Sequence, residues 1–336
     1  MSVGFGKSTL GAISLSLLAL TAIMWAAPSR GAAHLRERAL ERTVRAGVPL
    51  DNRSATAAVR RDQRVPLPVR FREVEGRGLL VSAWVNGAGP YTFAVDTGAG
   101  STILSERVAQ EARVSTVGNR VSIGGLSGAG VSSGREARLG SLAIGDRENL
   151  LPSESTVVVA AGGLPAGIDG VLDPTEGYWP LGYSIDMPRG EISAFDPHVN
   201  PLRPADAPPD GAVVPWLTDA RTRRPFVMLD LGRRALVDTG SGFGLAMSES
   251  VARATGVATL EGRDRDGVRD LGGGTIVARR VPPITVHIGS LVLRRIPTDV
   301  VSGVESGAPV LLGREALEPF QLTFDPLSRL IRIAPR

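Results

Sequence analysis

The feature that most constrains this chain of 336 residues is an internal duplication. Residues 91–100 (YTFAVDTGAG) return 142 residues later as residues 233–242 (RRALVDTGSG). Other matching segments follow in the same order: 105–109 with 248–252, 139–142 with 288–291, 168–170 with 311–313, and 183–186 with 322–325. Chance matches would not keep their order along the chain, so the body is predicted to consist of two homologous lobes.

Both halves carry the signals of short β-strands, which are apolar runs bounded by Gly, Pro, Asn or Asp. We predict strands at 79–85, 91–95, 212–217, 226–231, 281–288 and 330–333. Short helices are predicted at 105–112 and 248–255, because each begins with Ser followed by Glu and an apolar spacing. The Pro-rich stretch 200–210 cannot continue a central strand and is interpreted as the linker between the lobes.

In each half an apolar strand ends in Asp-Thr-Gly, at Asp96 and at Asp238. A single such Asp is usually a turn or strand-end cap, but two copies at equivalent places of a repeat indicate paired use. If the lobes pack about a pseudo-two-fold axis, the two carboxylates meet and share a proton. Such a pair provides a general acid and a general base without metal, cofactor or histidine.

These motifs resemble those of the retropepsin-like and pepsin-like aspartic peptidases, over residues 67–336. The apolar-apolar-Asp-Thr-Gly-Ala/Ser motif stands at 94–99 and 236–241, and the family's apolar-apolar-Gly element at 310–314 and, interrupted by Asp169, at 166–171. The resemblance implies an all-β acid-protease fold, with two homologous six-stranded lobes around a cleft. It implies that Asp96 and Asp238 are the catalytic pair and that Thr97 and Thr239 hydrogen-bond across the pseudo-dyad. The supporting loop residues would be Gly98, Ala99, Gly240 and Ser241.

The sequence departs from the family pattern at the next position, where Gly100 and Gly242 replace the more usual Ser or Asp. The Ser241 hydroxyl could hydrogen-bond Asp238, so we expect Asp238 to be the more readily ionised member of the pair. The Gly-rich segments 121–130 and 271–276 are interpreted as substrate-covering flaps, although ordinary loops remain the alternative. The predicted flap contacts are Gly124, Gly125, Leu126, Gly272, Gly273 and Gly274. Tyr178 and Trp179 are expected to serve packing.

Composition excludes several other classes of site. The chain has no Cys and only three His, spaced far apart, so thiol chemistry, disulfides and Cys-ligated metals are excluded and no metal or cofactor is expected. Lys and Arg number 38 against 34 Asp and Glu, and nine of the Arg lie within residues 28–66. The body is slightly acidic and poor in aromatic residues, which does not fit nucleic-acid binding.

The N-terminus carries Lys7 and then an apolar run over residues 10–27. Within residues 1–33, this pattern predicts export through a cleaved signal peptide or a retained membrane anchor, and both alternatives stay open. Residues 34–66 are predicted to be a basic tether, with an inhibitory prosegment as the alternative. The lobes are predicted at 67–199 and 212–336, with the linker at 200–211.

Together these observations predict an exported aspartic endopeptidase, periplasmic or secreted, that acts on extended protein segments. Extracytoplasmic parts of envelope proteins are plausible substrates on grounds of location. A monomer is expected, because two fused lobes need no dimerisation. Two alternatives remain: a catalytically inactive peptide-binding or scaffolding relative, and a single-lobed fold in which the second Asp-Thr-Gly is only a turn.

Overall fold

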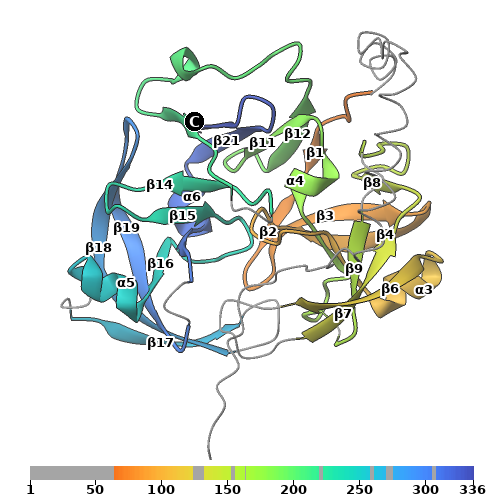
Figure 1. Cartoon of the computed structure of the whole chain (residues 1–336), viewed down its shortest axis with the longest axis horizontal. Helices are drawn as coiled ribbons and strands as arrows, with labels where there is room; N and C mark the ends of the chain where they lie inside the picture. Colours follow the sequence, from red (N-terminus) through yellow and green to blue (C-terminus); the bar gives the residue numbers. More distant parts are fainter. Residues whose placement is uncertain are drawn as a thin grey trace, which may run out of the picture.

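The computed structural model describes residues 64–123, 132–152, 156–162, 164–218, 222–257, 261–269, 275–304 and 308–336 (Figure 1). The predicted export segment and nearly all of the predicted tether therefore lie outside the described residues. Among the helices of the described part, none is long and apolar enough to cross a membrane.

The first lobe is built around a sheet that has nine strands within the described residues, in the order β2-β3-β4-β10-β5-β9-β7-β6, with β8 paired to β3. Its elements up to the second helix are β1 (Val69–Arg70), β2 (Arg72–Val74), β3 (Gly78–Val85), β4 (Ala88–Val95), β5 (Ile103–Ser105), α3 (Glu106–Glu111), β6 (Ser115–Ile123), β7 (Ser132–Arg138), β8 (Leu142–Ile144), β9 (Thr156–Ala160), β10 (Gly170–Leu172) and α4 (Pro174–Gly177). Two further strands, β11 (Gly182–Asp186) and β12 (Glu191–Phe195), belong to a different sheet.

The second lobe holds a sheet of seven strands within the described residues, in the order β14-β15-β20-β16-β19-β18-β17. A 3-10 turn, η1 (Pro204–Asp206), lies in the Pro-rich stretch before it. The elements that follow are β13 (Ala212–Pro215), β14 (Phe226–Met228), β15 (Arg234–Val237), β16 (Leu245–Ser248), α5 (Glu249–Ala254), β17 (Arg263–Arg269), β18 (Thr275–Ile288), β19 (Leu291–Ser302), β20 (Val310–Leu312), α6 (Arg314–Leu317), β21 (Phe320–Asp325) and β22 (Leu330–Pro335).

A third sheet joins the lobes, in the order β1-β12-β11-β21-β22-β13 (Figure 1). At its centre β11 and β21 pair antiparallel, with Ser184 opposite Thr323 and Tyr183 opposite Phe324. The Ser184 hydroxyl donates a hydrogen bond to the Thr323 hydroxyl at 2.9 Å, and the rings of Tyr183 and Phe324 stack with centroids 4.6 Å apart. Equivalent strands of the two repeats therefore meet here, as a pseudo-two-fold arrangement requires.

The all-β, two-lobed acid-protease fold expected from the sequence is confirmed, and the sheets of the two lobes have nine and seven strands within the described residues. The predicted strands are also confirmed, since each of them overlaps an observed one. Both predicted helices form, and they begin at Ser105 and Ser248. Each serine hydroxyl accepts the backbone N–H of the residue three positions on, at 3.3 Å, which satisfies one of the free donors of the first turn.

One sequence match is wrong in its register. β10 pairs parallel with β4 so that Leu172 lies beside Val95, and β20 pairs parallel with β15 so that Leu312 lies beside Val237. The first-lobe counterpart of residues 311–313 is therefore 171–173, and not 168–170 as the sequence comparison suggested. Asp169, which interrupted the sequence motif, lies outside the element.

Candidate active site

The two Asp-Thr-Gly loops follow directly on the buried ends of β4 and β15. The backbone N–H of Asp96 donates to the Leu172 carbonyl and that of Asp238 donates to the Leu312 carbonyl, both at 2.9 Å. Each loop is thus anchored by the strand beside its own. Two equivalent anchors of equal length place the loops in equivalent positions within their lobes.

Each aspartate binds the turn of its own loop. An oxygen of Asp96 accepts the Gly98 N–H at 2.8 Å, and an oxygen of Asp238 accepts the N–H groups of Gly240 at 2.9 Å and Ser241 at 3.0 Å. Backbone donors hold both carboxylates in one orientation and provide hydrogen bonds to their charged forms.

The carboxyl group of each loop also reaches across to the other loop, an arrangement that we call the crossing of the carboxyls. A Cβ atom placed on Gly98 would lie 2.8 Å from Cγ of Asp238, and one placed on Gly240 would overlap the Asp96 carboxyl. Each carboxyl therefore packs against the glycine of the opposite loop, which leaves no room for any larger residue there. The structure brings the two predicted catalytic residues together in one site.

Thr97 and Thr239 tie the two loops together beneath the carboxyls. The Thr97 hydroxyl donates to the Val237 carbonyl at 2.6 Å and accepts the Thr239 N–H at 3.0 Å. The Thr239 hydroxyl donates to the Val95 carbonyl and accepts the Thr97 N–H, both at 3.2 Å. Both threonines are fully buried, so these four reciprocal hydrogen bonds satisfy groups that water cannot reach.

Burial changes the acidity of both aspartates. Desolvation raises the pKa of Asp96, and the Gly98 N–H, Asp238 and the charge of Arg314 act in the opposite direction. The pKa of Asp238 is raised well above its usual range, first by burial and then by the negative charge of Asp96. Two carboxyl groups this close titrate as a pair, and the shared proton stays with Asp238.

The expected order of ionisation is therefore wrong: Asp96 is the more readily ionised member. The expectation relied on the hydroxyl of Ser241, which accepts the Phe243 N–H at 3.3 Å. The contact that Ser241 makes with Asp238 is through its backbone N–H, and the positive charge of Arg314 lowers the pKa of Asp96.

The unusual Gly100 is explained by its backbone conformation, and Gly242 lies close to the guanidinium of Arg314. A Cβ on Gly100 would lie 3.4 Å from Cδ of Arg224, and one on Gly242 would lie 3.3 Å from Nη2 of Arg314. Gly100 also has a φ of +75°, a conformation that other residues rarely adopt. Two buried arginines of the second lobe thus approach the positions where relatives more often carry Ser or Asp.

The predicted flap contacts, at 124–126 and 272–274, lie outside the described residues. The aromatic residues predicted to serve packing do so. Tyr178 is buried beside Tyr183, and the guanidinium of Arg223 lies 4.0 Å from the ring centroid of Trp179, which joins α4 to the second lobe.

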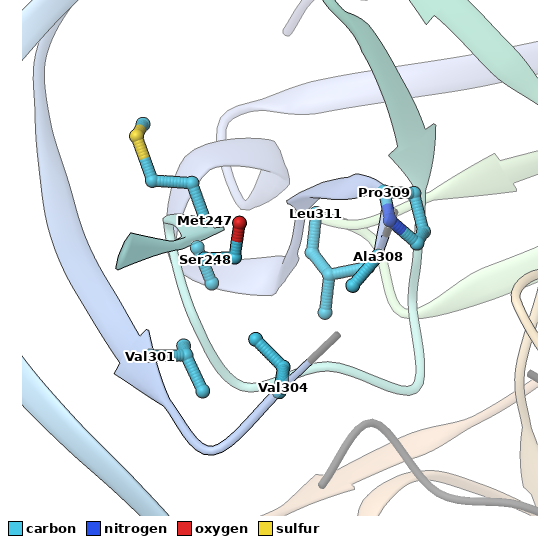
Figure 2. A pocket seen from close by; sticks show the side chains of 8 residues that line it. Met247, Ser248, Val301, Val304, Ala308, Pro309 and Leu311 are labelled. Atoms are coloured by element: carbon cyan, nitrogen blue, oxygen red, sulfur yellow. The ribbon is translucent and has the colours of Figure 1, made fainter. Parts of the chain in front are cut away.

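A small pocket lies beside the second-lobe loop, with an empty volume of about 170 Å³ (Figure 2). Its lining is mostly apolar: Ala246, Met247, Ser248, Val301, Val304, Ala308, Pro309 and Leu311. In Figure 2 the Leu311, Val304 and Val301 side chains line the pocket from neighbouring parts of the chain. Leu311 precedes Leu312, whose carbonyl accepts the Asp238 N–H, so β20 supplies both a residue of the pocket lining and the anchor of Asp238.

Sequence reasoning missed three charged residues at the site. Arg314 forms an ion pair with Glu73 of β2 at 3.0 Å, and Asp173 begins α4 as a buried N-cap. The Arg314 position stood within the family's second element, but no local pattern indicated its partner 241 residues away. The Asp173 position was obscured by the wrong register of the repeat.

The fold and the paired loops together define the two-lobed aspartic peptidases. A family model described as "Aspartyl protease" matches residues 81–172. Among solved structures, an aspartic proteinase from Irpex lacteus matches with a TM-score of 0.55 and 15% identity, over 80% of this chain and 97% of that chain. No curated protein matches the chain in sequence. The structural match shows that the chain has the fold of that aspartic proteinase, and the family model matches the part of the first lobe that contains Asp96.

Proposed function

We propose that this chain is an aspartic endopeptidase in which Asp96 and Asp238 activate water against a peptide bond held between the lobes. The observation that carries the proposal is the crossing of the two carboxyls, each packed against the glycine of the opposite loop. The hydrogen bonds of the two threonines hold this arrangement in place before substrate arrives, as catalysis by positioned acid and base groups requires.

The unequal rise of the two pKa values supports one assignment of the roles. Ionised Asp96 takes a proton from the attacking water, and protonated Asp238 gives its proton to the carbonyl oxygen. The resulting tetrahedral diol then loses its C–N bond. In that step Asp96 passes its proton to the leaving nitrogen, and one diol hydroxyl returns a proton to Asp238. Both groups end in their starting states, so the site is ready for another turnover.

The pocket beside the second-lobe loop supports binding of one apolar substrate side chain. The pocket as it stands has no room for a water molecule, so a bound side chain would have to displace part of its apolar lining. Filling it from its partly exposed rim with Ala308→Leu should slow cleavage of peptides with large apolar residues at one position. Peptides with Ala at that position should be cut at an unchanged rate, and a uniform loss over all peptides would contradict this role.

The proposed place of action is outside the cytoplasm. The support is the apolar run 10–27 behind Lys7, which suits export whether it is cleaved or retained as an inner-membrane anchor. Extracytoplasmic regions of envelope proteins would then be the substrates within reach. Fractionation of cells that express the full chain, with N-terminal sequencing of the product, tests both export and cleavage.

The catalytic proposal is tested by cleavage of a mixed peptide library between pH 3 and 8 by the full-length chain. Wild type should cut the peptides. Asp96→Asn and Asp238→Asn should each abolish cleavage, because each variant lacks one of the two carboxyl groups between which the protons move. Asp230→Asn is the matched control, since Asp230 is exposed and its carboxylate accepts the His287 backbone N–H in the second lobe. If wild type binds peptides without cutting any, the chain is a peptide-binding relative instead.

A further inference from the structure

The two halves of the site differ in what stands directly behind each catalytic loop. The strand register makes Asp173 the counterpart of Gly313, and the next residues, Pro174 and Arg314, are likewise equivalent. The same position therefore holds an uncharged ring in the first lobe and a guanidinium in the second. Duplication created two similar loops, and this position makes their electrostatic environments unequal.

Arg314 is held in place by both lobes. Its Nη1 donates to the Thr239 carbonyl at 2.7 Å, and its Nε donates to Glu73 of β2 in the first lobe at 3.0 Å. The Arg314 side chain is 10% exposed, whereas that of Glu73 is 50% exposed. Solvent therefore screens the negative charge of Glu73 far more than the positive charge of Arg314.

The crossing of the carboxyls decides which aspartate this charge affects. Asp96 packs against Gly240, and the residue before Gly240 is Thr239, whose carbonyl binds Arg314. Asp238 packs against Gly98 in the loop of the other lobe, where Pro174 occupies the equivalent position. Thr239 lies between Asp238 and Gly240, so the cation stands beside the second-lobe loop against which the Asp96 carboxyl packs.

Resting on the proposed function, we propose that Arg314 is a positioning residue that selects Asp96 as the base and leaves the shared proton on Asp238. Glu73 of the first lobe holds the guanidinium in the orientation that this selection needs. A site with two like loops would otherwise divide the proton more evenly between its carboxyls.

The other ionisable groups around Asp96 agree with this assignment. Asp238 faces Asp96 from the opposite loop, and Asp173 faces it from the end of β10. Burial raises the pKa of Asp173 well above its usual range, which favours the uncharged form of this carboxyl. Arg314 is the group whose positive charge lowers the pKa of Asp96.

The first test compares the pH dependence of kcat/KM for full-length wild type, Arg314→Gln and Arg314→Lys. Loss of an adjacent positive charge should move the acidic limb of the kcat/KM profile of Arg314→Gln to higher pH, by about one unit. Arg314→Lys keeps the charge without the two-pronged hydrogen bonding, so its limb should stay near that of wild type. An unmoved limb in Arg314→Gln overturns the proposal, as does an equal shift in both variants.

Arg280→Gln is the matched control, because it removes a partly buried arginine of the same lobe that pairs with Asp299 and Glu315. Its acidic limb should coincide with that of wild type. Glu73→Gln keeps an acceptor for Arg314 and removes the opposing negative charge, so its limb should move downward. An upward shift in Glu73→Gln would overturn the assignment of the effect to charge.

A readout without catalysis separates this proposal from the proposed function. Carboxyl carbons of labelled aspartates are followed by NMR titration in wild type, Arg314→Lys and Arg314→Gln, with Asp96→Asn and Asp238→Asn used to identify the signals. If wild type cuts no peptide, the endopeptidase proposal fails while this titration still decides the role of Arg314. The pKa of the first ionisation of the pair should rise in Arg314→Gln and not in Arg314→Lys. Identical titration curves for the three proteins would overturn the inference.

Discussion

Replacing Thr97 by Val, which has the same shape, should strongly destabilise the junction of the two lobes. The hydroxyl of Thr97 donates to the Val237 carbonyl and accepts the Thr239 N–H, and all three residues are fully buried. Val cannot provide either interaction. Because an orphaned buried polar group costs about 1–3 kcal/mol, two such groups cost about 2–6 kcal/mol. That is a large part of the ~5–15 kcal/mol by which domains are stable.

The measurement is urea unfolding of wild type and Thr97→Val, followed by fluorescence and by peptide cleavage. Thr323→Val is the matched control, because it removes one buried hydrogen bond, to Ser184, in the sheet that joins the lobes. The control should lose about 1 kcal/mol and keep the pH profile of cleavage. A Thr97→Val protein within about 0.5 kcal/mol of wild type would show that these hydrogen bonds do not hold the loops as argued.

Three other perturbations have definite expected results. Gly240→Ala should abolish cleavage, because the new methyl group would overlap the Asp96 carboxyl. The control Gly140→Ala, whose methyl would lie 3.3 Å from the side-chain oxygen of Asn86, should cut normally. Equal activities of the two variants would refute the crossing geometry. Asp299→Asn should lower stability by about 2–4 kcal/mol in chemical denaturation, because two arginines lose the fully buried carboxylate between them. Asp238→Asn should raise the melting temperature most at neutral pH. A carboxyl with a raised folded-state pKa stabilises the fold at acidic pH, and this contribution is lost as the pH rises through that pKa. The Asn variant has no carboxyl to ionise and avoids this loss. A constant difference in melting temperature from pH 4 to 7 would contradict that sign.

Much of this protein follows from local sequence signals. Apolar runs ending in turn residues located the strands, and Ser105 and Ser248 located the starts of two helices. The repeated Asp-Thr-Gly segments identified both loops of the site, and their duplication predicted that the loops meet. Such features depend on residues close together in the chain, so the sequence contains their physical causes.

The tertiary structure alone decided the electrostatics of the site. The register between β4 and β10 makes Asp173 the counterpart of Gly313, which sequence spacing had misassigned because the repeats differ in length. The pairing of Arg314 with Glu73 spans 241 residues and both lobes. A pKa depends on burial and on every charge nearby, whichever part of the chain supplies it. Local sequence therefore located both aspartates but predicted the wrong order of ionisation, because that order depends on how the lobes pack.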